Sequence, residues 1–164
     1  MAVRDFVALG AVLACALGGQ ASAACDTSRP SELIPDTRYQ LSGGQAYDST
    51  TDLTWERCSV GQRWTEGRGC TGKAARLNWK QATERGADGW RLPTHAELGT
   101  LVAKGCSPTI NPTVFPGMDP SSPWYWSSTS VEAETAWVVS FSGAPPYGSE
   151  RKGRFPVRLV KTGK

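Results

Sequence analysis

The residues that could perform covalent chemistry are scarce in this sequence. His95 is the single histidine among 164 residues, and a serine or cysteine nucleophile usually needs an imidazole beside it. His95 follows Thr94 at the start of an expected helix, which favours an exposed surface histidine. Glu132 and Glu134 could form a carboxylate pair of the kind that glycosidases use, although an exposed strand end explains them more simply. We therefore predict no catalytic residues, with a carboxylate-dependent hydrolase as the alternative.

Motifs that hold metals or cofactors are also missing from the sequence. There is no Cys-x-x-Cys pair, and the presence of only one histidine further disfavours a zinc site. No glycine-rich phosphate loop occurs, and Ser140-Phe141-Ser142-Gly143 lacks the leading glycine of a nucleophile elbow. The sequence predicts neither a metal nor a cofactor.

The N-terminal residues predict a secretory signal peptide over residues 1–23. Arg4 precedes an apolar stretch over 6–17, which is shorter than the roughly 18 residues of a spanning helix, and Ala21-Ser22-Ala23 forms a cleavage site. Cleavage after Ala23 predicts a periplasmic or secreted protein, and no later stretch is apolar enough to span a membrane. The alternative is a lipoprotein signal in which Cys15 becomes the acylated first residue.

The mature chain keeps four of the five cysteines. An even number in an oxidising compartment predicts two disulfides, for which three connectivities exist. Spacing favours Cys58 with Cys70, which closes a short glycine-rich loop. Cys25 then remains to join the N-terminus to Cys106.

The distribution of charge says more about function than the formal net charge of +3. This modest value argues against a strongly basic nucleic-acid binder and against a disordered chain. Basic residues gather in two stretches, 57–85 and 151–164, the second without any acid. They predict a face that binds an anionic polymer, with an ordinary solvated surface as the alternative. The candidate contacts are Arg151, Lys152, Arg154, Tyr125 and Tyr147.

The elements that must position these residues are short, and together they predict one α+β domain over 39–164 after a lead-in segment over 24–38. One helix is expected over 78–85. A second begins after Thr94, whose spacing to Glu97 fits a capping box, and ends before Gly105. Long irregular loops are expected over 105–123 and 142–153. The expected strands cover 39–41, 46–48, 53–55, 124–128, 137–141 and 155–160.

Tryptophans supply much of the expected core. Trp55, Trp79, Trp90 and Trp137 fall inside or beside predicted elements, where each would bury a large area. Trp90 and Leu92 should be buried between the two helices and the sheet, because the segment that joins the helices alternates apolar and polar residues.

Several short segments become specific in combination. They are Leu53-Thr54-Trp55-Glu56-Arg57-Cys58, Gly89-Trp90-Arg91-Leu92-Pro93-Thr94, Ile110-Asn111-Pro112, Trp124-Tyr125-Trp126-Ser127-Ser128, Ala136-Trp137-Val138-Val139 and Val157-Arg158-Leu159-Val160. Together they resemble a known bacterial family, the one named after the C-terminal domain of the Legionella collagen-like adhesin. The resemblance covers about residues 39–161. It implies a C-type-lectin-like fold, in which a small mixed sheet and two helices support a long loop region that binds ligand.

The function that this resemblance implies is adhesion to sulfated glycosaminoglycans. The chain lacks a collagen stalk, and it lacks the Glu-Pro-Asn, Gln-Pro-Asp and Trp-Asn-Asp triplets of calcium-dependent lectins. We therefore expect a binding module for an anionic, sulfated or uronic glycan or surface polymer, without calcium-dependent sugar binding. The alternative is an envelope structural or assembly protein that binds another protein.

Overall fold

The computed structural model describes residues 24–25 and 34–164. The predicted signal peptide, Cys15 and most of the lead-in segment lie outside these residues. The described part is α+β, with mostly antiparallel short strands and two short helices. In chain order the elements are β1 Ala24–Cys25, a 3-10 turn Asp36–Arg38, β2 Tyr39–Ser42, β3 Gln45–Asp48, β4 Leu53–Glu56, β5 Arg63–Thr65, β6 Gly69–Thr71, α1 Trp79–Thr83, α2 His95–Gly99, β7 Cys106–Ser107, β8 Trp124–Glu132, β9 Thr135–Ser140, β10 Tyr147–Glu150 and β11 Val160–Thr162.

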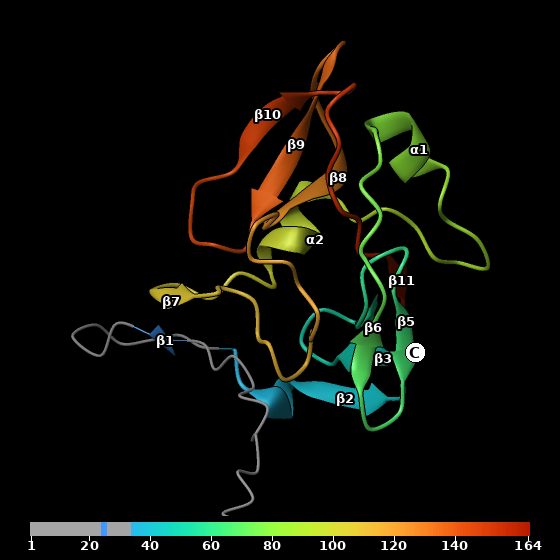
Figure 1. The fold of residues 1–164 in the computed structure, drawn as a ribbon, viewed down its shortest axis with the longest axis vertical. Helices are drawn as coiled ribbons and strands as arrows, with labels where there is room; N and C mark the ends of the chain where they lie inside the picture. Colours follow the sequence, from blue (N-terminus) through green and yellow to red (C-terminus); the bar gives the residue numbers. More distant parts are fainter. Residues whose placement is uncertain (1–23, 26–33) are drawn as a thin grey trace, which may run out of the picture.

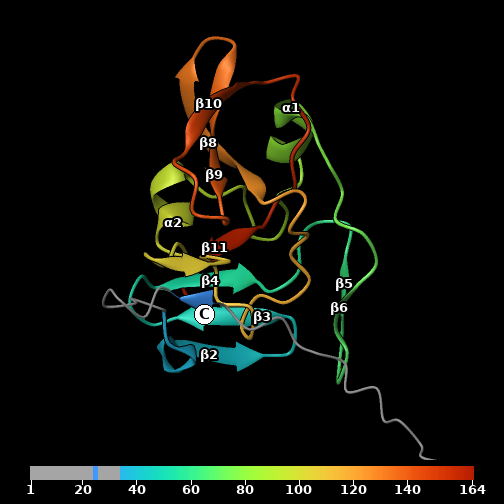
Figure 2. The same cartoon turned by 60° about the vertical axis from the view of Figure 1, so that its left-hand side comes forward.

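Two sheets form the body of the molecule. A four-stranded antiparallel sheet has the order β11-β4-β3-β2, and a three-stranded sheet has the order β10-β9-β8. Figures 1 and 2 show the three-stranded sheet together with the two helices in one half, and the four-stranded sheet in the other half. The predicted meander over 39–55 is confirmed as β2, β3 and β4, and Gly43 adopts a positive φ in the tight turn between the first two.

The C-terminal half departs from the prediction in two places. The expected last strand over 155–160 is wrong, because only β11 forms a ladder, with β4. The carbonyls of Pro156 and Val157 instead accept hydrogen bonds from the amides of Trp126 and Val60, which belong to two different segments. The second irregular loop is also partly wrong, because Tyr147–Glu150 pairs with β9 as the edge strand β10. Side-chain patterning gave no signal for β10, since an edge strand needs no buried face.

The core lies on both faces of β9. Val139 belongs to one apolar cluster with Trp55 and Leu98. Its neighbour Val138 belongs to a second cluster with Trp126. The alternation expected for this strand is therefore confirmed, and each of its faces contributes to a separate part of the core.

The helices are confirmed but are shorter than predicted. The capping box of α2 has the expected geometry: the Thr94 hydroxyl accepts from the Glu97 amide at 3.2 Å, and the Glu97 carboxylate accepts from the Thr94 amide at 2.7 Å. The helix α1 has an equivalent box, between Asn78 and Gln81, that sequence reasoning missed. Contacts with β8 and β9 hold α2, while α1 contacts β8.

The segment between the helices is only partly as expected. Leu92 is buried, but Trp90 is half-buried and lies under the Lys161 ammonium, 5.2 Å from the ring centre. Trp137 is half-buried too, because His95 stacks on its ring at 4.9 Å. The prediction of an exposed His95 is therefore wrong, because the residue is half-buried. Its helix packs against β9 and places the imidazole on an aromatic side chain.

Candidate functional site

A small ribbon, formed by β5 and β6, stands at the edge of the molecule, to one side of the four-stranded sheet (Figure 2). The predicted disulfide Cys58–Cys70 is confirmed, and it ties this ribbon to the chain just after β4. The second predicted pair involves Cys106, which is disulfide-bonded. The backbone register places Cys25 on β1 directly opposite Cys106 on β7, as the predicted pairing requires.

Arg57 fixes the inner face of the ribbon. Its guanidinium lies 3.9 Å from the centre of the Trp64 ring. The same group donates to the carbonyls of Val114, Gly43 and Thr113 at 2.8, 2.9 and 3.1 Å. Burial lowers the pKa of Arg57. This arginine, which the sequence places in a basic stretch, therefore joins the β2–β3 turn, the ribbon and the long loop, and it is not a surface contact.

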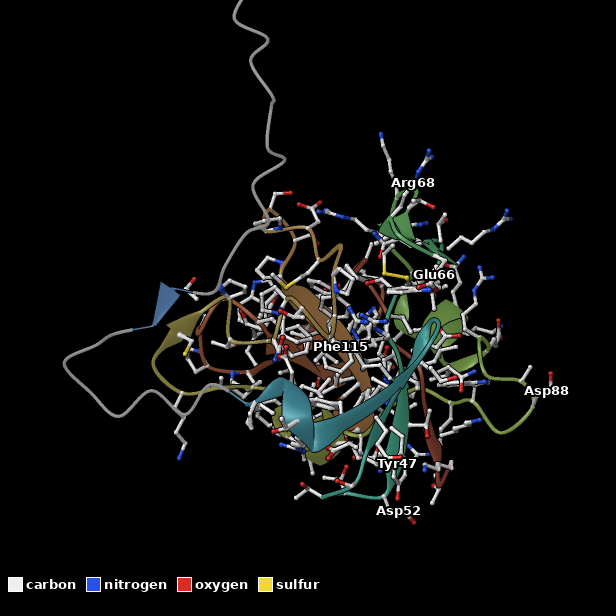
Figure 3. The ribbon with its side chains drawn as sticks, turned by 90° about the horizontal axis from the view of Figure 1, so that it is seen from below. Tyr47, Asp52, Glu66, Arg68, Asp88 and Phe115 are labelled. Atoms are coloured by element: carbon white, nitrogen blue, oxygen red, sulfur yellow. A yellow bond between two sulfur atoms is a disulfide. The ribbon has the colours of Figure 1, made fainter. Side chains whose placement is uncertain are left out.

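The ribbon and the long loop over 105–123 border a cavity of about 980 Å³ that is open to solvent. Trp64 and Gly69 line the side of the ribbon, and Asn111 and Met118 line the side of the loop. Figure 3 shows Phe115 in the middle of the molecule and Arg68 projecting outward from the ribbon, and both residues border the cavity. The long irregular loop predicted from sequence is thus confirmed apart from the short strand β7, and it forms a cavity wall.

The predicted ligand contacts do not form one surface. The prediction of Tyr125 as a ligand contact is wrong, because its ring is fully buried. Its hydroxyl forms a hydrogen bond with the Ser59 hydroxyl at 2.8 Å. The residue lies on the face of β8 that packs into the core, next to Phe141. Tyr147 is exposed and packs edge-on against Trp124, with 4.7 Å between ring centres.

The three basic residues predicted to bind a polymer differ in availability. Arg151 lies over the Trp79 ring at 4.1 Å and donates to the Ser130 hydroxyl at 2.8 Å. Lys152 is exposed, but its ammonium pairs with the Glu150 carboxylate at 2.8 Å, which raises the pKa of Lys152. Arg154 is exposed, and its side chain has no ion pair among the described residues.

A second set of cations gathers on and beside the ribbon. The side chains of Trp64 and Cys70 face the body of the molecule, so their strand neighbours face solvent. Among the described residues, no ion pair within 4.0 Å involves a cation of this set, and Arg76 acts only at longer range, on Asp119. The four exposed cations of this set are Arg63, Arg68, Lys73 and Arg76. All four belong to the stretch 57–85, and only the fold separates them from the buried Arg57.

A second arginine, Arg158, is fully buried behind the cavity. Its Nη1 atom donates to the carbonyls of Glu56 and Arg57, and its guanidinium lies 4.9 Å from the centre of the Phe115 ring. Burial lowers the pKa of Arg158 and raises the pKa of Glu56, a carboxylate in its electrostatic reach. Its hydrogen bonds connect the C-terminal segment to the end of β4, and its guanidinium packs against Phe115 in the wall of the cavity.

The chain matches a known protein family over most of its length. The family model described as the Lcl C-terminal domain matches residues 44–161, which is most of the chain. The chain belongs to this family. A search of curated proteins found no match. The match includes both helices, the ribbon, and both main sheets except β2 and the last residue of β11 in the Lcl C-terminal domain.

Two features were looked for in the described residues of this Lcl C-terminal domain protein, 24–25 and 34–164, and neither occurs there. No helix there is long and apolar enough to cross a membrane. Within the same residues, no group of three or more histidine, cysteine, aspartate or glutamate side chains is placed to hold a metal ion.

Proposed function

We propose that this chain is an exported, non-enzymatic binding module that recognises an anionic glycan or surface polymer, sulfated or uronic. The proposal includes cleavage after Ala23 and a C-type-lectin-like arrangement of the domain. The family relationship supports an adhesin-like role. The observation that carries the proposal is the set of four exposed cations on and beside the ribbon, Arg63, Arg68, Lys73 and Arg76, with only Glu66 as an acid between them in sequence.

The ribbon is a better binding surface than the face around Arg151. A polymer of sulfate or carboxylate groups needs cations that are free to approach it, and arginine offers forked contacts to both groups. Arg151 is already bound to Trp79 and Ser130, and Lys152 is partly neutralised by Glu150. On the ribbon, the disulfide and Arg57 hold the backbone, so its cations are presented from a fixed support.

Clustering is also required by electrostatic screening. Exposed charges act over only about 8 Å at physiological ionic strength, so scattered cations would not bind a polymer cooperatively. The register pairs Arg63 with Thr71 across the ribbon, and Arg68 lies in the turn between the strands. These positions spread positive charge along one short element, which suits the extended shape of a polymer chain.

The test compares two triple variants that remove the same charge from two surfaces. Arg63→Gln with Arg68→Gln and Lys73→Gln removes three cations from the ribbon. Arg151→Gln with Lys152→Gln and Arg154→Gln removes three from the face predicted from sequence. Salt-gradient elution from immobilised heparin, with thermal unfolding as the check on folding, compares both with the parent.

We expect the ribbon variant to elute at clearly lower salt than the parent and the Arg151-face variant to elute close to it. Equal losses in both variants would show that only net charge matters. Loss in the Arg151-face variant alone would return the site to that face. A parent protein that is not retained at low salt would exclude anionic-polymer binding, and the module would then have to recognise another class of ligand.

A further inference from the structure

Three polar side chains form a row across the outer face of the four-stranded sheet. Ser42 on β2 pairs with Gln45 on β3, and Gln45 pairs with Glu56 on β4. Residues directly opposite each other in an antiparallel sheet point to the same face. Their strand neighbours Ala46 and Trp55, on the other face, are fully buried in the core. The row of Ser42, Gln45 and Glu56, called the polar row below, therefore faces away from the core.

The ribbon turns this end of the outer face into a pocket. The polar row lies at the end of β2, the start of β3 and the end of β4, and the ribbon stands beside that end of the sheet (Figure 2). Trp64 of the ribbon lines the pocket with the polar row, and so does Cys58 of the disulfide. Gly44 permits this close approach, because a Cβ atom there would lie only 2.9 Å from Trp64 Cβ. The pocket has a volume of about 240 Å³ and is open to solvent.

The polar row is not used by the protein itself. Among residues 24–25 and 34–164, its three side chains form no hydrogen bond or ion pair. Glu56 is half-buried, and burial raises the pKa of its carboxyl, while Arg158 acts in the opposite direction. A half-buried carboxylate without a donor is costly, so the site favours a ligand that supplies one. In the next row of the same face, by contrast, the Tyr47 hydroxyl already donates to the Asp52 carboxylate at 3.0 Å.

The groups that line the pocket match the surface of a sugar ring. Carboxylate and carbonyl oxygens accept hydrogen bonds from hydroxyl groups, and an amide nitrogen or a serine hydroxyl donates to them. The apolar surface of an indole suits the C–H groups of a pyranose. The volume of the pocket lies below the roughly 300–1,000 Å³ of drug-sized sites, so it suits one ring and not a longer chain. Glu56 is the one charged residue in the lining, and its negative charge disfavours a sulfated or uronic ring.

We propose that this pocket binds one uncharged pyranose ring, with the sugar hydroxyls on the polar row and the sugar C–H groups against Trp64. The Glu56 carboxylate accepts from ring hydroxyls, and the Gln45 amide can both donate to them and accept from them. Arg57 lies over Trp64 at 3.9 Å from the ring centre and holds the indole in place. This inference goes beyond polymer binding by the ribbon and does not require it.

The structure supplies a site-specific probe for the test. In protein labelled with 5-fluorotryptophan, each of the seven tryptophans gives a fluorine resonance, and Trp64→Phe identifies that of Trp64. The ligands are the methyl glycosides of glucose, galactose and mannose, with glucuronate as a charged ring and glycerol as a small polyol. The pocket variants are Gln45→Ala and Glu56→Gln. Gln40→Ala is the matched control, because Gln40 is exposed on the same face of β2 but does not line the pocket.

We expect at least one of the methyl glycosides to shift the Trp64 resonance saturably, at roughly millimolar concentration. Glu56→Gln should weaken this binding about tenfold, since it replaces an ionised acceptor, and Gln45→Ala should weaken it about 3- to 10-fold. Gln40→Ala should leave it unchanged. An unchanged melting temperature shows that each variant is folded.

The pocket and the ribbon are tested separately by the same variants. Gln45→Ala should elute from heparin at the same salt as the parent. The triple variant of the ribbon, Arg63→Gln with Arg68→Gln and Lys73→Gln, should still bind the methyl glycoside. Loss of heparin retention without loss of sugar binding would therefore count against polymer binding alone.

Four outcomes would overturn the inference. One is the absence of a Trp64 shift with all three methyl glycosides. A second is an equal shift with glycerol at the same concentration, which would make the pocket a general polyol surface. A third is binding of glucuronate as strong as that of any methyl glycoside, which would contradict an uncharged ring. The fourth is an equal loss in Gln40→Ala and Gln45→Ala, which would place the sugar elsewhere on the sheet.

Discussion

Arg57→Met should destabilise the domain by about 3 kcal/mol, because the guanidinium satisfies three carbonyls that two separate segments, the β2–β3 turn and the long loop, present to it. The bond to the Val114 carbonyl, at 2.8 Å, is buried, so its loss leaves an acceptor without water and costs about 1.5–3 kcal/mol. The bonds to Gly43 and Thr113 are only partly buried. Water can replace the guanidinium at both carbonyls, and their loss should cost little.

The contact with Trp64 adds a smaller contribution. A guanidinium over an indole ring is worth about 0.5–2 kcal/mol, depending on desolvation. Methionine keeps most of the apolar stem of arginine, so little packing is lost. Arg57→Lys should fall between the parent and the methionine variant, because an ammonium keeps the charge but cannot reach three carbonyls in a plane.

Urea unfolding, followed by far-UV circular dichroism, measures the free energy of unfolding for each variant. Arg63→Met is the matched control, since Arg63 is exposed on the same ribbon and such surface changes stay within about 0.5 kcal/mol. A loss below about 1 kcal/mol for Arg57→Met would refute the reasoning, because it would mean that the Val114 carbonyl is solvated or that the loop finds another donor.

Three further predictions concern stability. Replacing Cys58 and Cys70 by serine should cost about 3 kcal/mol, the chain-entropy value for a loop with a sequence separation of 12, and urea midpoints of the oxidised parent and the double variant measure it. Trp90→Ala should cost about 1–2 kcal/mol, below the roughly 3–5 of a fully buried aromatic, because its ring is half-buried; a larger loss would mean that the ring packs into the core. Hydrogen bonds from the Arg91 guanidinium are the largest of the causes that lower the pKa of Glu97. The stability it contributes is present above its unfolded pKa and is lost as the pH falls from about 4.5 through the lower folded value. Glu97→Gln should therefore flatten the acid limb of the stability profile, and an unchanged limb would contradict the assignment.

Local signals in the sequence were sufficient for the elements whose structure is set by near neighbours. Thr94 and Glu97 are three residues apart, and their reciprocal hydrogen bonds require only the first turn of a helix. The pairing of Cys58 with Cys70 follows from a short loop. The spacing of Val139 and Phe141 places both in the same cluster, because side chains alternate along a strand.

The candidate site could be predicted only in part, because accessibility depends on contacts between distant segments. Arg57 and Arg63 look alike in a basic stretch, yet one is buried against loop carbonyls more than fifty residues away and the other faces solvent. Tyr125 follows directly after the long loop in sequence, which favours an exposed position, but the register of β8 with β9 turns its ring into the core. No local pattern distinguishes these outcomes.

The sequence by itself determined the class of the domain, its family resemblance, the first disulfide and the capped helix. The disulfide and the helix cap are each encoded within about a dozen residues, and the resemblance is carried by short segments spread along the chain. The tertiary structure decided which cations are free, where the edge strand β10 lies and that the proline-rich loop forms a cavity with the ribbon. The physical reason is that burial and charge pairing are set by whichever segment packs opposite a side chain. In this chain that segment is often far away in sequence, as Arg158 shows by binding the carbonyl of Glu56 across 102 residues.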